Sequence, residues 1–273
     1  MSVGQGRANV WIHGISGRMG REIQEICLNS RADRFALVGG SARSVENGTQ
    51  NVVSSPASIA AQLQSTQSQV ILDFSSASGN QVLLTALQYA RGIRDLAVLI
   101  GSTGMTEEDY QSWRSLAKER ELRLLFAPNT SIGILMAVKA ASLIAPSLKH
   151  LGFDIEITET HHRRKQDAPS GTAKFLAESV SASVGGLDIV TDRHGGRKEN
   201  ELGVHAIRGG GVFGEHEVRL IGDSEEVCVS HRAFSRTLFA DGALVLASWL
   251  VAQKSGVYGL LDIDPKELFS DRR

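Results

Sequence analysis

Cysteine and net charge are both scarce in this sequence, and each scarcity excludes a class of protein. Only Cys27 and Cys228 occur in 273 residues, far apart, which predicts reduced core residues rather than a disulfide framework. The formal net charge of −1 provides no field to attract nucleic acid or an anionic membrane. No basic stripe with interleaved aromatic residues is present either, so we expect no nucleic-acid partner.

A long hydrophobic run is also missing. The longest apolar stretch, residues 243–252, is shorter than the ~20 helical residues that cross a bilayer. The first residues lack the apolar core of a secretory signal. We therefore expect no membrane partner and a cytoplasmic location. The apolar fraction of 42% is enough for a core, and the length fits one large or two modest domains.

The first half of the chain alternates apolar strands with helices. The predicted strands, each nearly all apolar, are 9–13, 35–39, 70–74, 96–101 and 122–127. This alternation favours an α/β fold with a Rossmann-like, doubly wound parallel sheet. In such sheets the loops after the strands form the ligand crevice. Those loops are 14–20, 41–44, 74–79, 101–104 and 127–130.

The first of these loops is a glycine turn between a strand and a helix. Its spacing over Gly14–Gly20 is G-x-x-G-x-x-G, in the strand–turn–helix context of a dinucleotide-binding fingerprint, although an ordinary glycine turn is the alternative. After the next strand Arg43 stands where NAD binding favours an acidic residue. An arginine there suits the extra phosphate of NADP, unless it is simply a solvated side chain. The predicted cofactor-binding residues are Gly14, Ile15, Ser16, Gly17, Arg18, Met19, Arg43, Phe74, Gly101, Ser102, Thr103, Ala127, Pro128, Asn129 and Thr130.

The pattern changes after a long apolar helix expected over 132–148. Between 153 and 231 the predicted strands alternate apolar and polar residues, which favours a C-terminal α+β domain on an open mixed sheet. One helix cannot cover both faces, so we predict oligomerisation through the other face. The expected domains are 1–130 plus 237–273 for dinucleotide binding and 131–236 for substrate binding and oligomerisation. The stretch 47–68, rich in Ser, Gln and Asn, is expected to be a variable surface region.

One loop of this second part gathers reactive side chains. His161, His162, Arg163, Arg164 and Lys165 follow a predicted strand and precede a predicted helix. Adjacent histidines at a strand end point to opposite sides, so one could donate a proton while the other positions a substrate. Lys165 is either an acid, because neighbouring cations favour its neutral amine, or a permanent clamp for a carboxylate. Surface histidines in a solvated charge run are the alternative.

The same loop ends at a helix start. Asp167, Ser170 and Thr172 are candidate caps, and the free backbone N–H groups near Gly171 favour an anion. A serine nucleophile at Ser170 is disfavoured because the G-x-S-x-G elbow is missing. No metal is expected, since no cysteine or carboxylate has a spacing that would complete a site with the histidines. The loop therefore predicts a small anionic substrate that also receives a proton.

The stretch 156–173, with its core His161-His162-Arg163-Arg164-Lys165, closely resembles the defining motif of the dihydrodipicolinate reductase family. The resemblance covers essentially the whole chain. Further stretches in the family's order are 14–20, 72–75, 101–104, 127–133, 214–216 and 235–236. The resemblance implies NAD(P)H-dependent reduction of 4-hydroxy-tetrahydrodipicolinate to tetrahydrodipicolinate, in the diaminopimelate route to lysine.

The resemblance also implies residue roles. His161 would be the proton donor, with Lys165 as a second donor or a clamp. A small dianionic cyclic substrate would be held through its carboxylates by His162, Ser170, Gly171, Thr172 and Arg236. A homotetramer is implied as well. Arg43, near a position where the family often has an acidic residue, favours NADPH over NADH.

The sequence also departs from the family pattern near the nicotinamide. Asn129-Thr130 and Ile134-Leu135 replace the pairs commonly expected there, which implies that this part of the pocket differs in detail. Two other functions stay open: a dehydrogenase acting on another imine or amino acid, and a dinucleotide-sensing protein without turnover. The sensor has no need for an acid beside an anion site.

Overall fold

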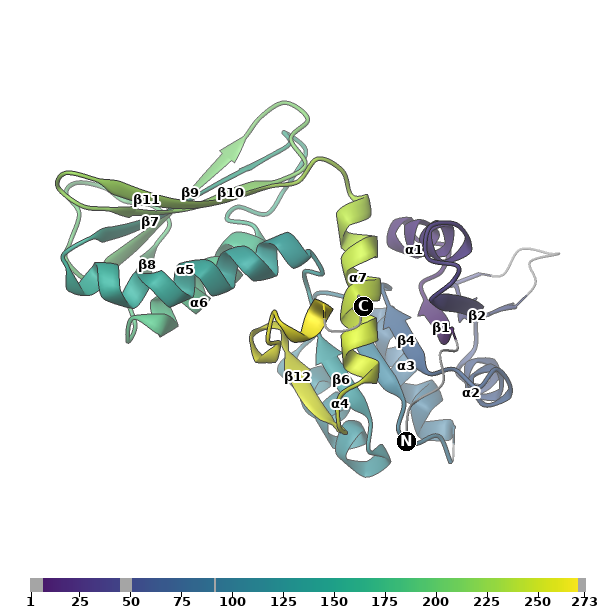
Figure 1. Cartoon of the computed structure of the whole chain (residues 1–273). Helices are drawn as coiled ribbons and strands as arrows, with labels where there is room; N and C mark the ends of the chain where they lie inside the picture. Colours follow the sequence, from purple (N-terminus) through teal and green to yellow (C-terminus); the bar gives the residue numbers. More distant parts are fainter. Residues whose placement is uncertain (1–6, 45–50, 91, 270–273) are drawn as a thin grey trace. The chain divides into compact units, whose positions relative to one another are not determined.

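The computed structural model describes residues 7–44, 51–90 and 92–269 (Figure 1). The chain forms two compact units. Unit 1 comprises Met1–Thr130 with Phe239–Arg273, and unit 2 comprises Ser131–Leu238.

Unit 1 is built on a parallel sheet. Its seven strands lie in the order β12-β6-β5-β4-β1-β2-β3, and every neighbouring pair is parallel. The strands are β1 (Ala8–His13), β2 (Phe35–Ser41), β3 (Val52–Val53), β4 (Val70–Asp73), β5 (Ala97–Ile100), β6 (Arg123–Phe126) and β12 (Gly256–Gly259). The helices are α1 (Arg18–Leu28), α2 (Pro56–Ser65), α3 (Ala77–Tyr89), α4 (Glu107–Arg120) and α7 (Thr237–Val251), with short 3-10 turns η1 (Leu260–Asp262) and η2 (Glu267–Phe269). The predicted Rossmann-like sheet is confirmed.

Apolar side chains explain the burial of this sheet. Strands β4 and β5 are buried at every position, as expected for central parallel strands covered on both faces. On one face Trp11, Ile71 and Val98 pack with Leu83 of α3 and Trp113 of α4. The carboxyl ends of β1, β2, β4 and β5 meet at one edge, because parallel strands with helical crossovers all run the same way.

The stretch 47–68 is only partly a surface region, which corrects the sequence prediction. Residues 45–50 lie outside the described residues, but α2 follows with Pro56 at its first turn and Ser55 as its cap. Ile59 and Leu63 of this helix are buried in the core. The other face of this helix is rich in Gln and Ser, so the single apolar pair at i and i+4 did not suggest a buried helix in the sequence.

Unit 2 contains a mixed sheet with helices on one face (Figure 1). Its five strands lie in the order β11-β10-β7-β9-β8; β10 is antiparallel to β7 and β11, whereas β7, β8 and β9 are parallel. The strands are β7 (Asp154–His161), β8 (Asp188–Val190), β9 (Glu201–Arg208), β10 (Glu215–Ile221) and β11 (Glu226–Arg232), and the helices are α5 (Ile132–His150) and α6 (Gly171–Ser183). The predicted α+β unit on an open mixed sheet is confirmed.

Helix α5 is long and apolar enough to cross a membrane by length and composition. Its Val138 and Ala141 are nevertheless buried with Ile155 and Ile157 of β7 and Leu176 of α6. The helix thus contributes one face to the core of unit 2.

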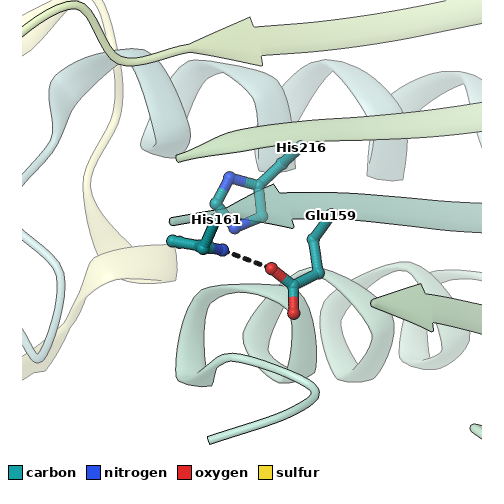
Figure 2. Close-up of side chains that lie close together, drawn as sticks. All are labelled: Glu159, His161 and His216. Carbon is teal, nitrogen blue, oxygen red and sulfur yellow. Dashed lines mark hydrogen bonds and ion pairs between the residues drawn. The ribbon is translucent and has the colours of Figure 1, made fainter. Parts of the chain in front are cut away.

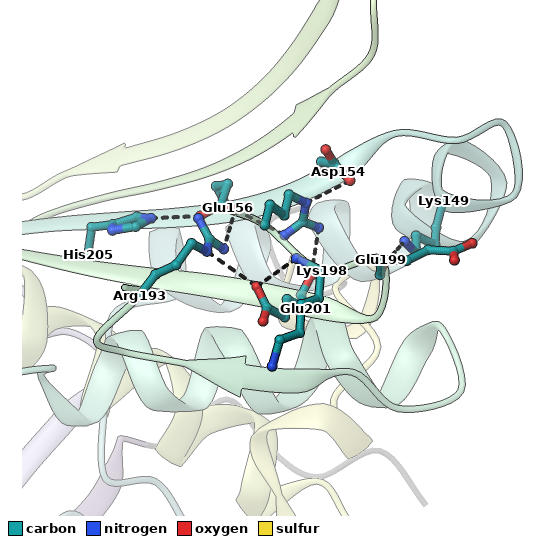
Figure 3. A network of polar contacts seen from close by, with 9 residues as sticks. Lys149, Asp154, Glu156, Arg193, Lys198, Glu199, Glu201 and His205 are labelled. Atoms are coloured by element: carbon teal, nitrogen blue, oxygen red, sulfur yellow. Dashed lines mark hydrogen bonds and ion pairs between the residues drawn. The ribbon is translucent and has the colours of Figure 1, made fainter. Parts of the chain in front are cut away.

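The sheet face of unit 2 opposite the helices is polar. Glu156 of β7 accepts hydrogen bonds from Arg193 (2.7 Å) and Arg197 (3.1 Å), and its Oε2 lies 2.6 Å from His205 Nε2 (Figure 3). Gly203 makes room for this cluster, since a Cβ there would lie 1.9 Å from Glu156 Oε2. Cys228 is exposed rather than in a core, which corrects the sequence prediction, whereas Cys27 is buried as expected.

Candidate active site

The reactive loop of unit 2 connects the end of β7 to the start of α6. Of the three candidate caps, Ser170 is the N-cap: its side chain accepts a hydrogen bond from Ala173 N–H at 3.1 Å. The Ser170 side chain is buried, so its hydroxyl fixes the helix start rather than facing solvent. Gly171 and Thr172 follow as the first helical residues, where backbone N–H groups favour an anion.

His161 is buried against a carboxylate that the sequence analysis did not single out. Its Nδ1 hydrogen-bonds Glu159 Oε2 (Figure 2). Glu159 is fully buried. Glu159 Oε1 in turn accepts Arg208 Nη2 at 2.7 Å and Ser170 N–H at 3.1 Å. Burial raises the pKa of the Glu159 carboxyl. The hydrogen bonds from His161, Arg208 and Ser170 lower this pKa by more than burial raises it, to about 2. Glu159 is therefore ionised at neutral pH.

A third imidazole, His216 of β10, lies beside this pair. Its ring is 5.2 Å from that of His161, edge to face, and its Nε2 is 3.4 Å from Ser170 Oγ. Burial lowers the pKa of His216, and the neighbouring His161 lowers it further, to about 3. His216 is therefore neutral at physiological pH and adds no positive charge next to His161.

The geometry corrects the reason given for excluding a metal. Ligand atoms of Glu159, His161 and His216 lie within 4.8 Å of one another, which the sequence spacing did not predict. Glu159 is two residues before His161, and residues i and i+2 of a strand share a face. The Arg208 guanidinium, 2.7 Å from Glu159 Oε1, disfavours a cation there because like charges repel.

His162 comes directly after the end of β7, and consecutive residues of an extended chain have side chains on opposite sides. Its backbone N–H donates to Val212 O at 2.8 Å, and the residue is half-buried. Desolvation lowers the pKa of His162, and the nearby charges of Arg164, Arg236 and His161 lower it further. The structure thus brings His162 and Arg236 into one electrostatic environment, although they are far apart in sequence.

Lys165 forms an ion pair within the loop. Its Nζ lies 2.8 Å from Asp167 Oδ1. Burial raises the pKa of Asp167. Lys165 and the backbone N–H groups of Asp167 and Gly171 outweigh this effect, so the pKa lies below its usual value. The carboxylate of Asp167 thus lies at the start of α6, between Lys165 and Gly171, where a carboxylate of a ligand would also be favoured.

Unit 1 contains a cavity of about 680 Å³ at the carboxyl edge of its sheet. Five of the predicted cofactor residues line it: Gly14, Ser16, Gly17, Arg43 and Phe74. The other lining residues are mostly small or polar: His13, Ala42, Ser54, Ser75, Ser76, Ser78, Gly79 and Val82. Five of these eight fall in the loops 41–44 and 74–79 that the sequence predicts to form the ligand crevice, whereas His13, Ser54 and Val82 lie outside the predicted loops.

The glycine turn fits a phosphate group. Gly14 has a φ of +82°, and a Cβ there would lie 2.9 Å from Phe74 O. A Cβ at Gly20 would lie 2.5 Å from Gly14 O, so glycine allows α1 to start directly beneath the turn. Gly17, the N-cap of α1, provides no side-chain cap, which leaves N–H groups at this helix start for an anion.

Ten predicted cofactor residues are not among the described residues that line this cavity: Ile15, Arg18, Met19, Gly101, Ser102, Thr103, Ala127, Pro128, Asn129 and Thr130. Some have structural contacts. Ser102 donates to Asp73 at 2.8 Å, and Thr130 donates to Phe239 O at 2.6 Å. Asp73 is fully buried and also accepts Ser75 N–H and Asn80 Nδ2, so it ties the loops after β4 and β5 together.

A Rossmann-like unit with a cavity at the carboxyl edge of its sheet is typical of dinucleotide-dependent oxidoreductases, and the second unit carries a cluster of one carboxylate and two imidazoles. Family models then identify the family. The model for the N-terminus of dihydrodipicolinate reductase matches residues 8–130, and the model for its C-terminus matches residues 133–263. The chain belongs to the dihydrodipicolinate reductase family, which confirms the resemblance found in the sequence.

Curated relatives support this assignment. A 4-hydroxy-tetrahydrodipicolinate reductase of Pelobacter propionicus is 37% identical over 267 residues, covering 92% of this chain and 96% of the relative. One from Aquifex aeolicus is 34% identical over 269 residues, covering 93% and 97%. Among solved structures, a dipicolinate-bound dihydrodipicolinate reductase from Paenisporosarcina sp. TG-14 has a TM-score of 0.76 at 24% identity, covering 95% of this chain and 100% of that one. The last comparison shows a shared fold.

Proposed function

We propose that this chain reduces 4-hydroxy-tetrahydrodipicolinate to tetrahydrodipicolinate in lysine and diaminopimelate biosynthesis. Unit 1 is the proposed dinucleotide-binding unit and unit 2 the proposed substrate-binding unit. A bound nicotinamide cofactor supplies the hydride. The observation that carries the proposal is His161, buried at the end of β7 on an ionised carboxylate and next to a helix start suited to anions. A proton donor beside an anion site is what reduction of a cyclic dicarboxylate requires.

In this proposal the residues around the α6 start bind the two carboxylates of the substrate. Gly171 and Thr172 offer backbone N–H groups, while Lys165, His162 and Arg236 add positive or polar partners. Asp167 holds Lys165 in the free protein, and a substrate carboxylate would replace it. The Paenisporosarcina protein has dipicolinate bound, a ring with two carboxylates, which agrees with a small cyclic dianion as the ligand.

We further propose that NADPH is preferred to NADH. Arg43 lines the cavity of unit 1 together with Ser54, and both suit a phosphate on the ribose. The open sheet face of unit 2 is the proposed interface of a homotetramer. We place the enzyme in the cytoplasm, where a biosynthetic reductase of this kind meets its cofactor.

The direct test is an NADPH-oxidation assay with substrate supplied by a coupled 4-hydroxy-tetrahydrodipicolinate synthase, with NADH run in parallel. The proposal predicts turnover that depends on the synthase product and a higher kcat/KM with NADPH. Oxidation that does not depend on the synthase product would contradict the reaction. A higher kcat/KM with NADH would contradict only the cofactor preference.

A further inference from the structure

We propose that Glu159 is the positioning residue of the proton donor: it holds the ring proton of His161 on Nδ1 and so makes Nε2 the atom that gives up the transferred proton. The kinetic part of this inference rests on the proposed function, since it takes His161 as the donor. The tautomer itself does not depend on which substrate is reduced.

The first step is that Glu159 is immobilised from three sides. It extends from β7, and its Oε1 accepts Arg208 Nη2 from the end of β9 at 2.7 Å and the N-cap Ser170 N–H of α6 at 3.1 Å. With Oε1 occupied by two donors, Oε2 is directed at His161 Nδ1. The carboxylate is fully buried, so water does not compete for it.

The second step concerns the proton. An ionised carboxylate can only accept hydrogen bonds, so the imidazole nitrogen facing it must be the N–H donor. This holds for both the neutral and the charged ring. The nitrogen that gains and loses a proton is therefore Nε2, since Nδ1 is the ring nitrogen that faces Glu159.

The third step is that a glycine leaves space beside Nε2. A Cβ at Gly214 would lie 3.0 Å from His161 Nε2, closer than an ordinary van der Waals contact. The backbone of Gly214 is not in the left-handed region, so its conformation does not demand glycine. We therefore attribute the glycine at this position to the space that it leaves beside His161 Nε2.

The charged and titratable groups around His161 fit this arrangement. Glu159 of β7 and Arg208 of β9 face its Nδ1 side, and His216 of β10 packs edge to face on the ring. Lys165 of the loop and His231 of β11 lie within electrostatic range of the same cluster. His216 is neutral, so the charge that forms when Nε2 binds a proton is balanced by Glu159.

The first test reads the tautomer without any substrate, by ¹⁵N chemical shifts of the histidine rings in the free protein. Wild type is expected to show neutral His161 as the Nδ1–H form. In Glu159→Gln, Arg208 should donate to the amide oxygen, so that the amide N–H faces Nδ1. Nδ1 must then accept a hydrogen bond, and His161 should shift to the Nε2–H form. Glu156→Gln is the matched control. Glu156 lies on the same strand but on the opposite face of the sheet, and it has its own arginine partners. This variant should leave the tautomer unchanged.

The second test is kinetic. Glu159→Gln should lower kcat by about 10- to 100-fold with KM changed by less than about 3-fold, and should move the alkaline limb of the pH–rate profile to lower pH. Gly214→Ala should keep the Nδ1–H tautomer and still lower kcat, because the methyl group crowds Nε2. Glu156→Gln should leave the pH–rate profile in place.

The outcomes separate the two claims. An Nε2–H tautomer in the wild-type protein, or an unchanged pH–rate profile in a folded Glu159→Gln variant, would overturn the positioning role. If Glu159→Gln does not fold, the wild-type tautomer and Gly214→Ala still decide the matter. An absence of turnover in wild type would defeat the proposed function, while the ¹⁵N measurement would still test Glu159.

Discussion

The surroundings of His161 are made by single residues from four different elements: Glu159 of β7, Ser170 at the start of α6, Arg208 of β9 and His216 of β10. His161 and Lys165 are in a recognisable run of residues. Arg208 and His216 come from other strands, 47 and 55 residues after His161 in the chain, and no local spacing points to them. Only Glu159 carried a local signal, since it shares a strand face with His161.

The buried neutral His216 predicts a specific acid sensitivity. Its pKa is about 3 in the folded protein against an ordinary value of 6.5, so the unfolded chain binds its proton first as pH falls. Stability from this residue is fully present above pH 6.5 and is lost below it. Between pH 6.5 and 4.5 the loss is at most about 2.7 kcal/mol, at 1.36 kcal/mol per pH unit.

Urea unfolding at pH 7 and pH 4.5 measures this effect. His216→Gln should lose less stability over that interval than wild type. The pKa of Glu159 is lowered toward 2, so its own contribution is lost only below about pH 4.5 and leaves the interval clear. Equal losses in the two proteins would show that His216 is not the neutral buried group described here.

Arg43 carries a second prediction at this scale. Arg43→Glu should shift the ratio of kcat/KM for NADPH over NADH toward NADH by about 10-fold or more, because a carboxylate repels the ribose phosphate and suits free hydroxyls. Arg114→Glu, on the exposed side of α4, is the matched charge control and should leave the ratio unchanged. A constant ratio in Arg43→Glu would remove this residue from cofactor selection.

At the scale of elements, the strands of unit 1 were predictable because buried parallel strands are runs of apolar residues. Helix α2 was missed because its apolar pair is short and its other face is polar. Strand β12 comes from the far end of the chain, pairs with β6, and has no sequence signal of its own beyond two glycines. Pairing over such a distance is decided by packing rather than by local pattern.

The glycine turn allows an element-scale test. Gly20→Ala would place a Cβ 2.5 Å from the backbone oxygens of Gly14 and Ile15, so the turn and the start of α1 must move apart. We expect the Kd for NADPH, measured by calorimetry, to rise by about 10-fold or more. Gly196→Ala, where a Cβ meets nothing within 4 Å, is the control. Unchanged NADPH affinity in Gly20→Ala would contradict the role of this turn.

At the scale of the whole molecule, the sequence predicted two kinds of sheet, and both are present. The number of copies in the assembly is a prediction that a single chain does not test. The open face of unit 2 is polar, with Glu156 and its arginine partners fixed on it, so association through it would use hydrogen bonds and ion pairs more than apolar burial.

Light scattering coupled to size-exclusion chromatography tests that assembly. Wild type should have the mass of a tetramer. Thr158→Arg, at the centre of the open face on β7, should reduce the mass while the circular dichroism spectrum is retained, because a new charge cannot be buried unpaired. Glu178→Arg, on the exposed side of α6, should keep the mass of wild type. Dissociation by the α6 control alone would place the interface elsewhere.

In the proposed reaction His161 delivers the proton to the cyclic dicarboxylate as it is reduced. The measurement that tests it most directly is the synthase-coupled oxidation of NADPH by wild type and His161→Ala, with NADPH affinity measured on both proteins. We predict that kcat falls by about 100-fold or more while the Kd for NADPH stays within about 2-fold. An unchanged kcat in His161→Ala would show that His161 is not the proton donor.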